Sequence, residues 1–242
     1  MERPRAAVVT GGAKGLGRAS ALRLAEDGRA IAIWDSDADA AKRTIAELNR
    51  RDAKALAVHV DVASPESLER AHTRTRDFLG PVDILVNAAA IIGVDASVLE
   101  TPLDEWERVL AVNLTGTYLA SRMVVGGMAE RGWGRIVNFT SGARHGTPAL
   151  VPYAVSKAGV VPITRAFARE FTSRGVLVNA VLPGRALTNM VVSRVPEEIV
   201  RNPPVAIGRY ADPEEVAEVV AFLTSERNTY MSGGIVPVDG GG

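Results

Sequence analysis

Short runs of apolar, often β-branched residues alternate along the whole chain with longer segments of helical periodicity. Such alternation predicts a mostly parallel sheet with helices on both faces. The expected strands are Ala6–Thr10, Ala30–Trp34, Ala55–Val60, Ile84–Asn87, Arg135–Thr140, Val176–Leu182 and Ile235–Val238. The expected helices are Gly15–Asp27, Asp39–Arg51, Pro65–Leu79, Pro102–Ala129, Pro152–Ser173 and Asp212–Thr224. The sequence therefore predicts an α/β, doubly wound fold with a sheet of about seven strands.

One domain is expected over residues 1–242, because no linker, repeat or low-complexity tract interrupts this alternation. Only the stretch from Pro183 to Arg209 breaks it, with four prolines and no clear period. Long irregular segments inside compact domains commonly form functional loops. We therefore expect a substrate lid at about 183–209.

Composition narrows the possible functions. The 28 basic and 28 acidic residues give zero formal charge, so the chain lacks the basic character of nucleic-acid-binding proteins. The absence of cysteine excludes zinc–thiolate sites and cysteine nucleophiles, and the three histidines are too dispersed for a metal cluster. No apolar stretch approaches the roughly 18 residues of a membrane-spanning helix, and no signal peptide precedes the first strand. We expect a cytoplasmic protein that uses no metal and binds neither nucleic acid nor membrane.

A glycine-rich turn follows the first expected strand and leads directly into a helix. Backbone N–H groups at such a helix start, together with the helix dipole, bind the pyrophosphate of a dinucleotide. The turn predicts a Rossmann-like domain. Its candidate cofactor contacts are Gly11, Gly15, Leu16 and Gly17.

The second expected strand ends next to Asp35, 18 residues after Gly17. A carboxylate at this place accepts hydrogen bonds from the adenosine ribose and repels a 2′-phosphate, so it favours NAD over NADP. Lys14 in the glycine turn could instead pair with a 2′-phosphate, or simply be solvated. Asp61 and Val62 close the third strand and could contact the adenine ring, although a helix-initiating turn is an equally good interpretation.

Tyr153 and Lys157 stand four residues apart in an expected helix, so both lie on one helix face. A phenol is a poor base at neutral pH unless a nearby cation favours the phenolate. Lys157 could supply that cation. Ser141 follows a strand and would place a hydroxyl at the carboxyl edge of the sheet, where ligands of open α/β folds bind. Such a hydroxyl can donate to a carbonyl oxygen as charge develops on it.

Together these residues resemble the short-chain dehydrogenase/reductase family, and the resemblance covers essentially the entire chain. It rests on Thr10-Gly11-x-x-x-Gly15-x-Gly17, Asp61, Asn87-Ala88-Ala89, Asn113, Ser141, Tyr153-x-x-x-Lys157, Pro183-Gly184 with Thr188, and Val238-Asp239-Gly240-Gly241.

The resemblance implies a role for each of these residues. Tyr153 would be the general acid/base, Ser141 would hold the substrate oxygen, and Lys157 would lower the Tyr153 pKa while binding the nicotinamide ribose. Asn113 would kink its helix and anchor a water in a proton relay to Lys157. Thr188 would bind the nicotinamide carboxamide. The remaining cofactor contacts implied are Asn87, Pro183 and Gly184.

Two departures from the family pattern stand out. The family's Asn-Asn-Ala-Gly appears here as Asn87-Ala88-Ala89-Ala90, so the second asparagine is missing. The family's spacing from the active serine to the active tyrosine is about thirteen residues, whereas Ser141 and Tyr153 are twelve apart and Thr140 stands at thirteen. We choose Ser141, with Thr140 as the alternative.

The expected function is NAD-dependent hydride transfer between nicotinamide and a secondary alcohol or ketone. One alternative is an NADPH-dependent 3-oxoacyl carrier-protein reductase, and an alternative of another class is a non-catalytic nucleotide sensor. Arg144 and Arg185 could bind an anionic group of the substrate. By resemblance, the long helices and the glycine-rich terminus would form the interfaces of a homotetramer.

Overall fold

The computed structural model describes residues 3–242 and contains one sheet of seven parallel strands. Their order across the sheet is β3-β2-β1-β4-β5-β6-β7. The strands are β1 (Ala6–Thr10), β2 (Ala30–Asp35), β3 (Ala55–His59), β4 (Val82–Asn87), β5 (Gly134–Phe139), β6 (Val176–Pro183) and β7 (Ile235–Val238). The doubly wound, Rossmann-like α/β fold expected from the sequence is confirmed, with strand ends shifted by no more than two residues.

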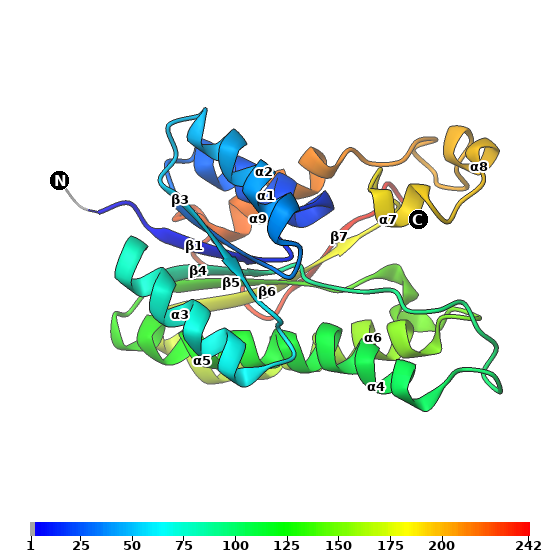
Figure 1. Cartoon of the computed structure of the whole chain (residues 1–242), viewed down its shortest axis with the longest axis horizontal. Coiled ribbons are helices and arrows are strands. Elements are labelled where there is room, and N and C mark those ends of the chain that lie inside the picture. The colour runs from blue at the N-terminus through cyan, green and yellow to red at the C-terminus, as the bar shows by residue number, and fades with distance from the viewer. Residues whose placement is uncertain (1–2) are drawn as a thin grey trace.

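Helices cover both faces of this sheet (Figure 1). One layer contains α1 (Gly15–Glu26), α2 (Ala38–Asn49) and α9 (Pro213–Thr224). The other contains α3 (Pro65–Leu79), α5 (Gly116–Glu130) and α6 (Val151–Phe171). Each layer packs on alternate residues of the strands, because successive strand side chains point to opposite faces. In β1, Ala6 and Val8 face the α3/α5/α6 layer, and Ala7 and Val9 face the other.

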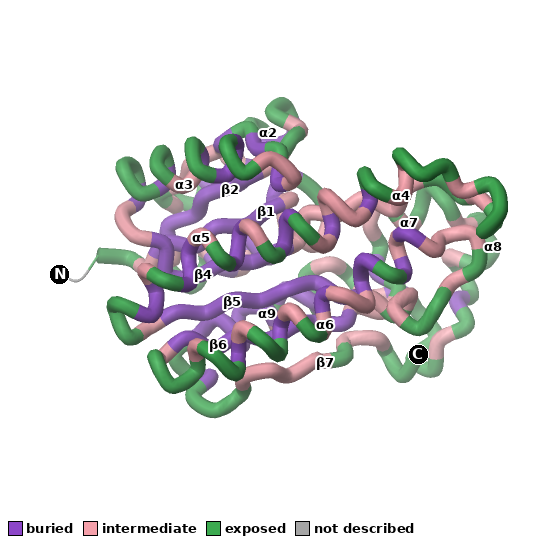
Figure 2. The backbone as a smooth tube through the Cα atoms, turned by 90° about the horizontal axis from the view of Figure 1, so that it is seen from below, coloured by how far each residue is buried: buried purple, intermediate pink, exposed green. Residues whose placement is uncertain are grey.

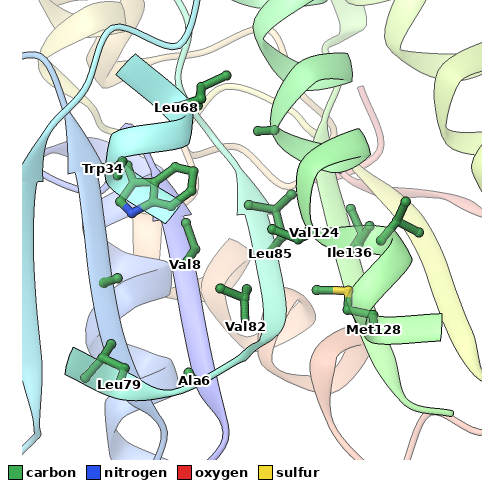
Figure 3. Packing of buried hydrophobic residues seen from close by; sticks show 14 of the residues in the cluster. Ala6, Val8, Trp34, Leu68, Leu79, Val82, Leu85, Val124, Met128 and Ile136 are labelled. Carbon is green, nitrogen blue, oxygen red and sulfur yellow. The ribbon is translucent and has the colours of Figure 1, made fainter. Parts of the chain in front are cut away.

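The largest side chain of the core is Trp34, which is fully buried in the α3/α5 layer (Figure 3). Its indole Nε1 donates to the Thr75 hydroxyl at 2.9 Å, so the one polar atom of the ring is paired. Leu68, Leu85 and Ile136 are fully buried in the same cluster. Burying such side chains stabilises the fold by about 1.5–3 kcal/mol each. This packing fixes the sheet and, with it, the starting positions of the residues that follow the carboxyl ends of its strands.

The prediction of a single helix over Pro102–Ala129 is wrong, because the structure interrupts it. The structure divides this segment into α4 (Leu103–Leu110), a π-helical turn (Ala111–Thr115) and α5. The Gly116 N–H donates to the carbonyl of Ala111, five residues back. Asn113 lies inside the π turn and is fully buried. Turns of this kind inside α-helices frequently occur at functional sites.

The segment after β6 extends beyond the carboxyl ends of the strands (Figure 1) and contains two short helices, α7 (Asn189–Val192) and α8 (Glu197–Arg201). Figure 2 shows that it is mostly exposed or intermediate, in contrast to the buried sheet. It touches the loop after β4 through Arg194, which donates to the Asp95 carboxylate and the Gly93 carbonyl. Among residues 3–242, no helix has the length and apolar character needed to cross a membrane.

Candidate active site

The glycine turn after β1 is shaped by close backbone contacts. A Cβ on Gly17 would lie 2.2 Å from the Gly11 carbonyl oxygen, and a Cβ on Gly11 would lie 2.6 Å from Ala89 Cα. Gly11 and Gly15 also have positive φ, at +64° and +51°, which favours glycine. These three glycines are therefore required by the turn itself, independently of any ligand.

The helix that follows this turn begins without a capping side chain. Lys14 occupies the N-cap position of α1, no side chain of the described chain caps that helix, and its first turn contains no acid. The starts of α3 and α9 are instead capped by Ser64 and Asp212. The first N–H groups of α1, at Gly15, Leu16 and Gly17, are thus available to an anion, which fits the diphosphate of a dinucleotide.

The Asp35 carboxylate lies beside this turn at the end of β2. One oxygen accepts from the Ala13 N–H at 2.9 Å and the other from the Asp37 N–H at 2.8 Å. Lys14 forms an ion pair with Asp37. The lysine that could have met a 2′-phosphate therefore already has an anionic partner.

The remaining predicted cofactor residues lie along the same edge of the sheet. Asp61 and Val62 follow β3; the Asp61 carboxylate accepts from Ala63 N–H, and Val62 is buried against Gly116 of α5. Asn87 ends β4, where its side-chain amide donates to Ser121 and Asn138. Its Oδ1 is buried and has no hydrogen-bond partner among residues 3–242.

Pro183 and Gly184 lie at the end of β6, and the Gly184 N–H donates to the Val238 carbonyl at 2.9 Å. Thr188 begins α7 without capping that helix. A Cβ on Gly15 would lie 3.4 Å from Thr188 Cγ2, so the start of the lid faces the glycine turn.

Ser141 and Tyr153 come together from two different elements. Ser141 directly precedes a short 3₁₀ helix (Gly142–His145), and its Oγ accepts from the Ala143 N–H at 3.2 Å. Tyr153 lies in the first turn of α6. Burial raises the pKa of the Tyr153 phenol, and a hydrogen bond with the Ser141 side chain acts in the opposite direction.

Lys157 is buried one helical turn further along α6. Its Nζ donates to the Phe139 carbonyl at 2.9 Å and lies 5.9 Å from the centre of the Tyr153 ring. Burial lowers the pKa of Lys157 to about 8. In this arrangement the partner that lowers the Tyr153 pKa is Ser141, whereas the sequence interpretation gave that role to Lys157.

The choice between Ser141 and Thr140 depends on where each hydroxyl points. Thr140 is buried, and its Oγ1 donates to the Lys157 carbonyl at 2.8 Å. Ser141 Oγ accepts a backbone N–H, and the structure pairs its side chain with the Tyr153 phenol. The geometry therefore favours Ser141 as the residue next to a substrate oxygen.

Asn113 reaches from the π turn to two other elements. Its side-chain amide accepts from Ile91 N–H and donates to Ile91 carbonyl, both at 2.8 Å, and Nδ2 also donates to Ser156 of α6 at 3.0 Å. The amide thus attaches the loop after β4 to the helix that carries Tyr153. The π-helical turn agrees with the predicted distortion, but this two-point contact with Ile91 was not anticipated.

The arginines proposed as substrate ligands have different surroundings. Arg144 follows Ser141 in the 3₁₀ helix and contacts the Ser141 carbonyl at 3.4 Å. Arg185 instead donates to the buried Tyr210 hydroxyl and lines a cavity of about 270 Å³ with Arg209 and Asp239. Arg194, which the sequence interpretation passed over, joins the lid to the loop after β4. Arg194 lies in a segment without helical or strand periodicity, so no sequence pattern singled it out as a functional residue.

No group of three or more histidine, aspartate or glutamate side chains arranged to hold a metal ion occurs within residues 3–242. The arrangement described above can bind a dinucleotide at the start of α1 and exchange a proton at Tyr153.

Comparisons with known proteins agree with this interpretation. A family model described as enoyl-(acyl carrier protein) reductase matches residues 11–242. The chain is 39% identical over 241 residues to the 3-oxoacyl-(acyl-carrier-protein) reductase FabG of Aquifex aeolicus (strain VF5), covering 98% of this chain and 96% of that protein. It is 36% identical over 240 residues to the 2-dehydro-3-deoxy-L-rhamnonate dehydrogenase (NAD(+)) of Sphingomonas sp. (strain SKA58), covering 98% and 94% of the two chains.

Solved structures lead to the same family. The fold matches levodione reductase with a TM-score of 0.94 and 32% identity, over 100% of this chain and 98% of that one. It matches an actinorhodin polyketide ketoreductase variant with NADPH at a TM-score of 0.92 and 35% identity, over 98% and 97%. The chain therefore belongs to the short-chain dehydrogenase/reductase family and is a nicotinamide-dependent oxidoreductase that acts on CH–OH groups.

Proposed function

We propose that the protein moves a hydride between NAD and the carbon of a secondary alcohol or ketone, with Tyr153 as the general acid/base. The observation that carries this proposal is the hydrogen bond between Ser141, just after β5, and Tyr153 on α6, beside the buried Lys157. Two hydroxyl groups that meet at the carboxyl edge of the sheet can both reach one substrate oxygen. When bound, the nicotinamide ring supplies the hydride acceptor or donor.

The protein groups handle the proton and the charge. In the reduction, Tyr153 donates its proton to the substrate oxygen, while the Ser141 hydroxyl donates a hydrogen bond to the same atom. The Ala143 N–H holds Ser141 Oγ as an acceptor, which leaves the Ser141 proton free to point at the substrate. Lys157 would hold the nicotinamide ribose, and the N–H groups of Gly15, Leu16 and Gly17 would hold the diphosphate.

The preference for NAD over NADP is supported by two carboxylates next to the glycine turn. Asp35 lies where the adenosine ribose would bind, and Asp37 neutralises Lys14. A 2′-phosphate would meet both negative charges. We expect faster turnover with NADH than with NADPH. Asp37→Ala, which frees Lys14 and leaves Asp35 in place, is expected to raise the NADPH rate relative to NADH, whereas Asp39→Ala on the exposed face of α2 serves as the control.

The catalytic assignment is tested by Tyr153→Phe. This variant is expected to lose turnover while it still binds NADH, measured by the change in nicotinamide fluorescence. Tyr230→Phe, at a position that is 96% exposed, is the control and should keep full activity. A panel that includes meso-2,3-butanediol, acetoacetyl-CoA and aliphatic ketones, followed by NADH absorbance, identifies the substrate class. Retained turnover in Tyr153→Phe would refute the assignment.

A second candidate is the NADPH-dependent reduction of 3-oxoacyl groups on a carrier protein. It is favoured by the 39% identity to the Aquifex protein. Equal or faster initial rates with NADPH than with NADH, on a 3-oxoacyl thioester, would select this reaction over the first.

We also propose that the chain associates into a homotetramer. An aromatic row on α5 and α6 supports this, because Tyr118 packs edge-on against Phe167 at 6.0 Å and yet remains 41% exposed. Val155, elsewhere on α6, is also 41% exposed. Light scattering should give four times the 25.6 kDa chain mass, and a monomer would contradict the proposal.

A further inference from the structure

Three consecutive residues at the carboxyl end of β5 each make one hydrogen bond to helix α6. Asn138 Nδ2 donates to Thr164 Oγ1 at 2.9 Å. The Phe139 carbonyl accepts from Lys157 Nζ at 2.9 Å, and Thr140 Oγ1 donates to the Lys157 carbonyl at 2.8 Å. Lys157 is therefore held at its main chain and at the end of its side chain by two adjacent residues.

The strand geometry explains why this pattern is possible. Residues 138 and 140 are two apart, so their side chains point to the same face of the sheet, which is the face that α6 covers. The Phe139 side chain points to the opposite face and packs in the α1/α2/α9 layer. Only the Phe139 carbonyl is left to interact with α6. Asn138, Thr140, Thr164 and Lys157 are all at least 97% buried, so water cannot replace these bonds.

Helix α6 lacks one of its own hydrogen bonds next to Lys157. Pro162 lies inside the helix, five residues after Lys157. Because proline lacks an N–H group, the helical hydrogen bond to the carbonyl of Ala158 cannot form. The turn next to Lys157 is thus weakened from within, and the bond from Thr140 attaches it to the strand.

We propose that Thr140 is a positioning residue. Its hydroxyl holds the turn that carries Tyr153 and Lys157 in the position along β5 that brings these side chains next to Ser141. Thr140 is adjacent to Ser141 in the chain and bonded to Lys157 across the interface, so it is the shortest link between the two halves of the site. This inference rests on the proposed function of Ser141, Tyr153 and Lys157. It differs from a catalytic role for Thr140, because the hydroxyl proton already points at the Lys157 carbonyl.

A second anchor lies at Thr164, about two helical turns further along α6. Asn138 also accepts from Asn87 Nδ2 at 2.8 Å, and Asn87 donates to Ser121 of α5. Side-chain hydrogen bonds from Ser121 through Asn87 and Asn138 to Thr164 therefore connect α5, β4, β5 and α6. Since Thr164 Oγ1 in turn donates to the Val160 carbonyl, this anchor is fully paired on the α6 side.

The test compares Thr140→Val with Thr140→Ser. Valine keeps the shape of threonine but removes the donor, whereas serine keeps the donor. Thr224→Val is the matched control, since Thr224 is a buried threonine whose hydroxyl donates to a helix carbonyl in α9, in the layer on the opposite face of the sheet. The chain has only four lysines, so NMR of isotope-labelled lysine side chains can follow Lys157 directly. Lys14, Lys42 and Lys54 are exposed, which makes the buried Lys157 signal distinct.

If Thr140 positions Lys157, Thr140→Val should let water reach the amine. The pKa of Lys157, which burial holds at about 8, should then rise by at least about half a unit. Turnover of the best substrate in the panel should fall about tenfold to a hundredfold in kcat, with little change in KM for the cofactor. Thr140→Ser should restore both quantities, and Thr224→Val should alter neither.

The inference is overturned if Thr140→Val folds and its Lys157 titrates as in the wild type, or if Thr140→Ser fails to restore the titration. If the valine variant does not fold, Thr164→Val is used, which removes the partner of Asn138 and should shift the Lys157 titration in the same direction by a smaller amount. The NMR titration does not depend on turnover. Retained activity in Tyr153→Phe would therefore refute the proposed function without deciding the role of Thr140.

Discussion

The Lys157 ammonium and the Phe139 carbonyl form a hydrogen bond of 2.9 Å in a site where the lysine is only 3% exposed. Its ordinary pKa of 10.5 falls to about 8 because burial removes water from the charged form. The single Phe139 carbonyl dipole does not replace the lost hydration. Holding a cation beside Tyr153 therefore lowers the stability of the fold.

This cost predicts a specific dependence of stability on pH. A lysine whose pKa is lowered in the folded state destabilises the fold below pH 8, and the effect fades as pH rises toward 10.5. The drop from 10.5 to about 8 corresponds to roughly 3 kcal/mol. Lys157→Met should therefore unfold at a higher temperature than the wild type at pH 7, and the difference should shrink by pH 10.

The control for this prediction is Lys54→Met, which removes an exposed lysine. Its unfolding temperature should follow that of the wild type at every pH. If Lys157→Met were less stable than the wild type at pH 7 and the gap did not change with pH, the bond to Phe139 would outweigh the desolvation.

Gly17→Ala should damage both the fold and cofactor binding. The added Cβ would lie 2.2 Å from the Gly11 carbonyl oxygen, a contact that forces the turn and α1 apart. We expect a loss of about 1–3 kcal/mol in unfolding free energy and weaker NADH binding, measured by denaturant unfolding and fluorescence titration. Gly126→Ala is the matched variant, because Gly126 lies in α5 and the new Cβ would meet nothing within 4 Å apart from its own helix backbone. It should stabilise by up to about 1 kcal/mol. Similar effects at the two positions would show that the turn is not tightly packed.

Arg194 should control how often the lid separates from the loop after β4. It bonds to both the Asp95 carboxylate and the Gly93 carbonyl, whereas Asp95 contributes only the first contact. Exposed pairs of this kind contribute about 0–1 kcal/mol. Arg194→Ala should therefore speed hydrogen exchange in residues 184–209 more than Asp95→Ala does, and it should raise KM for the substrate a few fold.

Arg201→Ala serves as the comparison for the lid. Arg201 pairs with Glu197 inside the lid and does not reach the loop, so its removal should leave the exchange of the rest of the lid unchanged. Added salt should reduce the difference between Asp95→Ala and the wild type, since the ion pair is screened. Equal exchange in all three variants would mean that the lid is held elsewhere.

The strands and most helices could be predicted because their apolar periodicity directly reflects burial between two layers. The expected helix over Pro65–Leu79 has the observed bounds, and β1 and β7 agree residue for residue. The π turn at Ala111–Thr115 could not be predicted in the same way. The helical periodicity of Pro102–Ala129 continues through these residues, whereas the Asn113 side chain of the turn binds Ile91, which is distant in the sequence.

The site was predictable as a set of residues but not in its contacts. The motifs placed Ser141 and Tyr153 near each other, whereas the spacing left Thr140 as an alternative. The structure distinguishes the two hydroxyls through the Lys157 carbonyl, a partner that no local pattern reveals. Arg185 illustrates the same limit, because its side chain turns toward Tyr210 although its position in the chain suggested the substrate.

Asn113→Asp should make stability depend on pH in the opposite direction to Lys157. A carboxylate at this place would still accept from the Ile91 N–H, but it could no longer donate to the Ile91 carbonyl or to Ser156. Burial next to a carbonyl oxygen raises the pKa of such an acid above its unfolded value, so the folded state binds the proton more tightly. Stability relative to the wild type should be greatest at low pH and be lost as pH rises through that raised pKa. Thermal unfolding at pH 5 and pH 7.5 measures the effect, with Asn113→Ala as a control whose deficit, about 1–3 kcal/mol, does not change with pH. An equal deficit of Asn113→Asp at both pH values would mean that water reaches the side chain and that the contact with Ile91 is not enclosed.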